Sequence, residues 1–149
     1  MPTTKLTEHF TLDEFTASQT AARMGIANIP SGQELSNVQR TAETMEKVRT
    51  ILGSRPVLIS SGYRSPEVNR AVGGSSTSAH MSGLAVDFTV PGFGSPIDIC
   101  RALTPHMAAL QIDQLIHEFD SWVHLGLAAG APRMMALTID SGGTRNGFA

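Results

Sequence analysis

The sequence predicts one α+β domain in which a central antiparallel sheet carries helices on one of its faces. Three observations favour this fold class. A helical apolar stripe runs over residues 36–52, and residues 83–90 and 122–127 alternate apolar and polar side chains as half-buried strands do. A further apolar run ends two residues before the second of these strands, which is the spacing of an antiparallel hairpin. The 149 residues suit a single hydrophobic core.

The composition argues against several classes of partner. The formal net charge is −2 and no run of like charges occurs, so we expect no binding to nucleic acid. No apolar run approaches the ~20 residues of a membrane span, and no signal peptide pattern opens the chain. We therefore expect synthesis in the cytoplasm without membrane insertion. The single cysteine, Cys100, lies in an apolar stretch and is expected to be a small buried side chain.

The N-terminal part of the chain predicts one short and one long helix. Thr11 can cap a short helix over residues 12–15, and residues 21–30 are expected to form an ordered loop. The long helix begins in a capping-box pattern at Ser36 and ends before Gly53, a natural C-terminal stop. Its apolar residues recur at helical spacing and form one stripe, made by Val38, Ala42, Met45, Val48 and Leu52.

The next segment predicts a strand, a short helix and a flexible loop. Residues 56–60 form an apolar run typical of a buried strand, and Arg64 lies just beyond its end. Ser65 and Pro66 have the residue types of an N-cap and a first helical position. Residues 72–78 are rich in glycine and serine and are expected to form a loop.

A second strand and a further helix follow. Residues 83–90 alternate so that Asp87 projects from the face opposite the apolar residues. Ser95 and Pro96 then open a helix, and Pro105 stops or restarts it.

The last strands predict a hairpin. Residues 115–119 and 122–127 flank two turn-forming residues at 120–121. A tight turn there brings Glu118 close to His124 across the ladder, although the two are separated in sequence.

The end of the chain carries weaker signals. Residues 134–139 are expected to add an edge strand, and residues 142–147 to form a loose tail. The single domain of residues 1–149 then has its core within about residues 8–140.

His80, Asp87 and His124 are the candidate metal ligands. Two imidazoles and one carboxylate are the ligands of a catalytic zinc ion, one per chain, that keeps a coordination position open for water. Each residue alone is weak, because a lone histidine in a strand is more often packed or exposed. The combination of Ser-x-His-x2-Gly-x-Ala-x-Asp with Glu-x3-Trp-x-His is more specific and predicts a zinc hydrolase. A carboxylate just upstream of the last histidine, Glu118 or Asp120, would serve as general base.

Three segments, residues 60–69, 72–87 and 118–124, resemble a known family. They are similar to the zinc peptidases of the D-Ala-D-Ala carboxypeptidase and L-Ala-D-Glu endopeptidase group, which share their fold with the hedgehog signalling domain. Residues 9–15 also resemble the opening of the short, phage-type branch, so the similarity spans about residues 8–127. The resemblance implies a hedgehog/DD-peptidase-like fold.

The resemblance also implies roles for individual residues. It places zinc on the three candidate ligands and a glutamate base six residues before His124, at Glu118. Other branches have the base three residues before that histidine, which here is Ser121 and cannot serve. Asp120 remains the alternative base. Arg64 matches the arginine that holds substrate near the scissile bond, with a surface ion pair as the alternative.

Two further residues are candidates for substrate binding. Ser78 precedes His80 and can cap or hydrogen-bond near the site. Trp122 shares a strand face with His124, where it either lines a substrate groove or packs in the interior. The sequence leaves these two interpretations of Trp122 equally open.

The implied activity is hydrolysis of peptide bonds in peptidoglycan stem peptides, of the D,D-carboxypeptidase or L-Ala-D-Glu endopeptidase type. The phage-type opening suggests an endolysin of a phage or prophage. Such an enzyme would act as a monomer on the cell wall, after release through a membrane lesion made by a holin-type partner. Alternatives are a non-catalytic zinc-containing wall-binding module and a phage structural protein. The presence of Glu118 and Arg64 argues against the binding module.

Overall fold

The computed structural model of the protein describes residues 4–148 and confirms the α+β fold class. The helices are α1 (Leu12–Thr16), α2 (Gln19–Met24), α3 (Gln33–Ile51), α4 (Pro66–Ala71), the 3₁₀ helix η1 (Ala79–Ser82), α5 (Pro96–Leu103), the 3₁₀ helix η2 (Thr104–His106) and α6 (Met107–Leu110). The strands are β1 (Leu58–Ser61), β2 (Ala85–Thr89), β3 (Ile112–Glu118), β4 (Trp122–Leu127), β5 (Met135–Asp140) and β6 (Gly143–Asn146).

The strands form one six-stranded sheet in the order β1-β2-β4-β3-β5-β6. Neighbouring strands are antiparallel except for β3 and β5, which are parallel. The sheet is therefore mixed, whereas the sequence predicted an antiparallel one. The reason lies in the connection after β4. The chain reverses direction, passes β3 and adds β5 on its far side, and a strand that runs opposite to β4 is parallel to β3.

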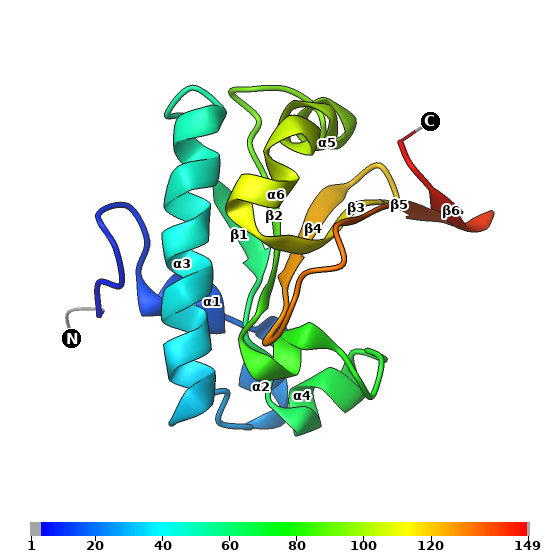
Figure 1. Cartoon of the computed structure of the whole chain (residues 1–149). Helices are drawn as coiled ribbons and strands as arrows, with labels where there is room; N and C mark the ends of the chain where they lie inside the picture. The colour runs from blue at the N-terminus through cyan, green and yellow to red at the C-terminus, as the bar shows by residue number, and fades with distance from the viewer. Residues whose placement is uncertain (1–3, 149) are drawn as a thin grey trace.

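The hydrophobic core lies between one face of this sheet and the helices α3, α5 and α6. Helix α5 contacts β3, β4 and α3, whereas α1, α2 and α4 gather near the end of the sheet where β1 and η1 lie (Figure 1). The predicted stripe of α3 is fully buried, and its partners are apolar side chains of α5, β2, β3 and β4: Ile99, Leu103, Val86, Phe88, Leu115, Val123 and Leu125. The opposite face of the central strands is therefore free for polar side chains.

Two N-terminal elements differ from the sequence prediction. Helix α3 begins at Gln33 after Gly32, and the backbone N–H of Ser36 already bonds within the helix to the Gly32 carbonyl. The capping-box pattern at Ser36 is thus internal to the helix. Helix α2 occupies part of the expected loop, because the Ser18 side chain caps its start and Gly25, with a φ of 65°, ends it.

The C-terminal segment is also more ordered than predicted. Residues expected to form a loose tail make β6, which pairs with β5 and replaces it as the edge strand. An ion pair of 2.7 Å between Asp140 and Arg145 crosses this hairpin. Strand β6 is exposed along its whole length, so it carries none of the apolar alternation by which a strand is recognised in sequence.

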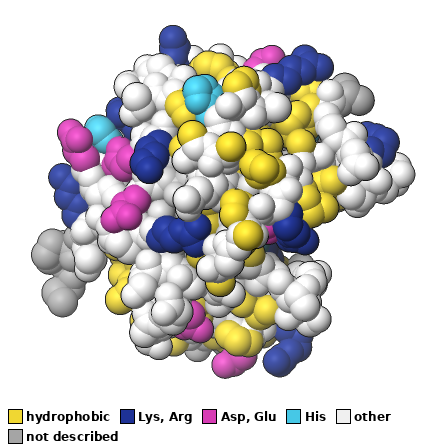
Figure 2. Space-filling model, viewed as in Figure 1, with side chains coloured by type: hydrophobic (Ala, Val, Ile, Leu, Met, Phe, Trp, Pro, Cys, Tyr) yellow, Lys and Arg dark blue, Asp and Glu magenta, His cyan; other side chains and the backbone are white. Residues whose placement is uncertain are grey.

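The surface agrees with the small net charge. On the face shown in Figure 2, basic side chains are dispersed among acidic ones and do not form a continuous stripe. Within residues 4–148, no helix has both the length and the hydropathy needed to cross a membrane. Cys100 is buried on α5 as expected, and burial raises the pKa of its thiol to about 12.

Candidate metal centre

The face of the sheet opposite the core brings the three predicted ligands together. Asp87 on β2 pairs in register with His124 on the neighbouring β4, and His80 lies in η1 just before β2. One nitrogen of each histidine and one oxygen of Asp87 all lie within 4.8 Å of one another. His80 is 1% exposed and His124 is 8% exposed, so this cluster is largely shielded from water.

The hydrogen bonds of His80 show which of its nitrogens can bind a metal. Its Nδ1 lies 2.7 Å from the carbonyl oxygen of Gly62, which can only accept, so Nδ1 carries the proton. Its Nε2 then has a free lone pair. That atom is buried, has no hydrogen-bond partner in the described part of the chain, and lies 3.3 Å from Oδ2 of Asp87. Two electron-rich atoms at this distance favour a cation between them.

The second histidine completes a donor set that fits zinc. Nδ1 of His124 lies 2.9 Å from Oδ1 of Asp87, whereas His80 lies beside Oδ2 of the same carboxylate. Burial opposes ionisation of Asp87, but its hydrogen bond with His124 and the nearby His80 imidazole outweigh burial and hold the pKa of Asp87 well below its usual range. Asp87 is therefore a carboxylate, the form that metal binding requires.

Local sequence fixes the position of His80. The Ser78 hydroxyl accepts a hydrogen bond of 3.2 Å from the His80 backbone N–H and so caps η1. Gly83 ends this helix with a φ of 78°, and a Cβ there would lie 2.7 Å from the carbonyl oxygen of Glu34 in α3. Glycine is therefore required both for the backbone conformation and for the close packing of η1 against α3.

The sequence comparison agrees with this geometry. The family model described as Peptidase M15 matches residues 8–126, which include all three ligands. This protein belongs to the peptidase M15 family. It is a zinc metallopeptidase, as the resemblance of its motifs predicted, and His80, Asp87 and His124 form its potential metal site. No curated protein matches the chain.

Glu118 of this M15 peptidase lies beside the metal site, as the predicted hairpin implied. It occupies the end of β3 opposite Trp122, and its Oε1 is 3.8 Å from Nδ1 of His124. Burial, assisted by the negative charge of Asp87, raises the pKa of Glu118 against the opposing attraction of His124 and Arg64. A carboxylate with a raised pKa is a stronger base than one in water.

Arg64 follows β1 and lines the same groove as Asp87. Its backbone N–H donates a 3.0 Å hydrogen bond to the His80 carbonyl, which fixes the two segments together. The Nε of its guanidinium is buried without a hydrogen-bond partner among the described residues. Burial lowers the pKa of Arg64, and the charges of Asp87 and Glu118 partly restore it. The peptidase thus holds a cation with a free Nε donor beside its metal ligands.

A groove crosses the sheet on both sides of the metal site. One hollow of about 800 Å³ extends over β3 and β5 and is lined by His80, His124 and Glu118. A second of about 670 Å³ extends toward β1 and α2. The two hollows share four lining residues at their junction, Arg64, Val72, Asp87 and Trp122. A substrate can therefore extend in both directions from the metal.

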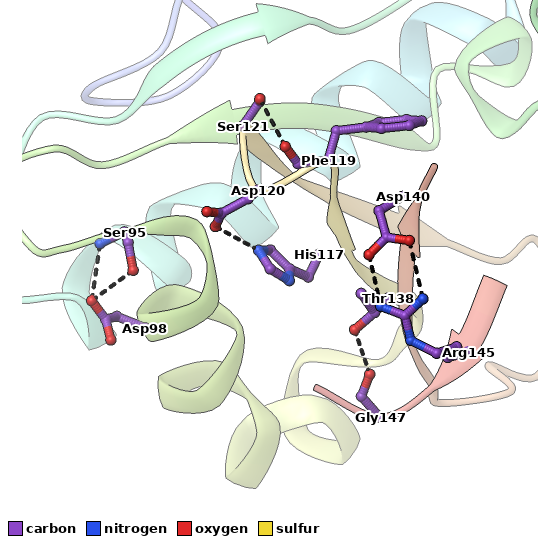
Figure 3. Close-up of polar contacts among 10 residues, drawn as sticks. All are labelled: Ser95, Asp98, His117, Phe119, Asp120, Ser121, Thr138, Asp140, Arg145 and Gly147. Carbon is purple, nitrogen blue, oxygen red and sulfur yellow. Dashed lines mark hydrogen bonds and ion pairs between the residues drawn. The ribbon is translucent and has the colours of Figure 1, made fainter. Parts of the chain in front are cut away.

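The remaining predicted residues are Ser78, Trp122 and Asp120, and only the first two line the groove. Ser78 and Trp122 line the larger hollow, and Nε1 of Trp122 is buried without a hydrogen-bond partner among residues 4–148. Asp120 lines neither hollow, and its Oδ1 lies 3.0 Å from Nε2 of His117 (Figure 3).

The sequence prediction gave no role to Phe119, which also lines the groove. The predicted strand extended to Phe119 and the predicted turn comprised residues 120–121, but β3 ends at Glu118 and Phe119 is a central residue of the turn. The side chain of Phe119 lines the larger hollow. A bulky aromatic residue directly after a candidate base, at a predicted tight turn, is the signal that could have identified it.

Proposed function

We propose that this peptidase hydrolyses peptide bonds in peptidoglycan stem peptides as the lysis enzyme of a phage or prophage. The observation that carries the proposal is the convergence of Glu118 and Arg64 on the His80–Asp87–His124 site within one groove. The similarity of residues 9–15 to the phage-type branch supports the lytic role. The acting unit is a monomeric single domain of residues 1–149, which a holin-type partner releases to the cell wall.

The residues of the groove divide the chemistry between them. When bound, zinc supplies a Lewis acid that lowers the pKa of water and polarises the scissile carbonyl. Glu118 accepts the proton of the attacking water and passes it to the leaving amine. Arg64 donates hydrogen bonds to the substrate oxygen that gains negative charge, since its Nε donor has no acceptor within residues 4–148. Ser78 and Trp122 contact the peptide along the groove wall.

The shape of the groove favours an endopeptidase of the L-Ala-D-Glu type over a carboxypeptidase. A carboxypeptidase has to recognise a free terminal carboxylate, typically with an unpaired cation where the substrate ends. Arg133 lines the outer part of the larger hollow, but it already holds Asp113 through hydrogen bonds of 3.0 and 2.7 Å. Arg64 lies at the junction of the two hollows, where a chain can pass on either side.

The activity is tested by incubating the zinc-loaded protein with stem peptides and weighing the products, with and without a zinc chelator. Each peptide is supplied with a free and with an amidated C-terminus. We expect chelator-sensitive cleavage of both forms, because an endopeptidase does not need the terminal carboxylate. Cleavage of the free form alone would indicate a carboxypeptidase. Intact peptides with zinc bound would favour the wall-binding module.

Replacement of Arg64 tests the oxyanion-binding role. Arg64→Lys is expected to lower kcat by about 10²-fold, because an ammonium cannot reproduce the planar fork of donors. The melting temperature should stay close to that of the wild type, since the charge and the aliphatic stem remain. Steady-state kinetics and thermal melting measure the two effects. Arg70→Lys, an exposed substitution at the end of α4, is the control, and equal kcat values in both variants would refute the role.

A further inference from the structure

We propose that Phe119 is a specificity-determining residue, whose ring forms with Trp122 an aromatic wall for the aliphatic part of the peptide beside the scissile bond. This inference rests on the proposed function of the groove. Three independent observations carry it: the backbone conformation of Phe119, the way its turn is held, and the exposure of its ring.

The backbone of Phe119 is unfavourable for its side chain. Phe119 and Asp120 are the central residues of the turn between β3 and β4, which the Ser121 N–H closes with a 3.0 Å bond to the Glu118 carbonyl. Their φ angles are 52° and 51°, as in a type I′ turn. Asparagine or glycine adopts this conformation readily, but a bulky aromatic residue does not. Strain of this kind tends to persist where a side chain serves function.

The turn is held by groups other than the Phe119 ring. Nε2 of His117 donates a 3.0 Å hydrogen bond to Oδ1 of Asp120, and the Ser121 hydroxyl donates one of 3.0 Å to the Phe119 carbonyl. The Phe119 N–H donates a 2.8 Å bond to the Ile139 carbonyl of β5. In Figure 3 the Asp120 carboxylate points to His117, while the Phe119 ring extends away from both. The ring is therefore not needed to close the hairpin.

The ring instead faces the groove. Phe119 is 50% exposed, so it adds little to the hydrophobic core. Its ring centroid lies 5.8 Å from that of Trp122, with the two planes tilted by 42°. Both residues line the larger hollow together with Glu118 and His124. Partly exposed aromatic rings next to catalytic groups offer an apolar surface that a ligand can cover. Methyl and methylene groups of a stem peptide match that surface.

The test replaces Phe119 by asparagine, which removes the ring and suits the left-handed backbone. Trp122 is the one tryptophan of the chain, so its fluorescence reports binding at the wall directly. Stem peptide is titrated into the zinc-loaded Glu118→Gln protein with and without Phe119→Asn. We expect the ring loss to raise Kd about 10-fold, the effect of losing one moderate apolar contact. In the otherwise wild-type enzyme, KM should rise similarly while kcat changes less than about twofold.

Met134 offers a matched control. It also has a positive φ, 53°, and an exposure of 50%, but it does not line either hollow. Met134→Asn should therefore leave Kd and KM unchanged, while both asparagine variants keep or raise the melting temperature. Unchanged Kd and KM in Phe119→Asn would overturn the proposal, as would a lower melting temperature with normal binding. Failure of the proposed function is distinguishable, because the wild-type enzyme would then leave bound peptide intact.

Discussion

His124→Ala is expected to abolish zinc binding and hydrolysis together. The substitution removes one of the three potential metal ligands and the hydrogen-bond partner of Oδ1 of Asp87. Because the metal contributes several kcal/mol of transition-state stabilisation, turnover should fall by more than about 10³-fold. Zinc stoichiometry of the purified protein, measured beside the rate of peptide cleavage, gives both quantities. His80→Ala should behave in the same way.

His106→Ala is a suitable control for these two variants. His106 lies at the end of η2, outside both hollows of the groove, and its loss should leave zinc content and turnover unchanged. A full zinc complement in His80→Ala and His124→Ala would show that these residues do not hold the metal. The ligand assignment would then have to be abandoned, whatever the remaining activity.

Glu118→Gln is expected to keep zinc and lose turnover by about 10² to 10⁴-fold, the usual contribution of a general base. The amide has nearly the shape of the carboxylate but cannot accept the proton of water. Zinc binding should persist, since Glu118 lies outside the three-residue cluster whose donor atoms converge. Cleavage kinetics and metal content of the same preparation separate the two expectations.

Asp120→Asn distinguishes the two carboxylates near the end of β3. Asp120 is held by His117 on the other side of the turn, so its replacement should preserve most of the turnover. If Asp120→Asn were inactive and Glu118→Gln active, the base would be Asp120. Loss of zinc from Glu118→Gln would give Glu118 a structural or ligand role instead.

Alternation along the strands made the metal site predictable. The apolar residues of β2 and β4 occupy one face, so Asp87 and His124 had to share the other, and the structure places them directly opposite each other. The stripe of α3 was predictable for the same reason, because the periodicity of a helix is contained in a few consecutive residues. Short elements were less accessible. Helix α2 and strand β6 depend on capping and on a neighbouring strand more than on an apolar pattern.

The amino-acid pattern alone thus specified the ligand types, the faces of β2 and β4, and the family. Other features of the site depend on contacts between residues that are distant in sequence, and only the tertiary structure determines them. The Gly62 carbonyl selects Nε2 of His80 as the metal-facing nitrogen, from 18 positions away in sequence. The turn after β3 separates Glu118 from Asp120, although they are two residues apart. Side-chain alternation is a local property, whereas hydrogen-bond partners and the two-sided groove arise only when remote segments meet.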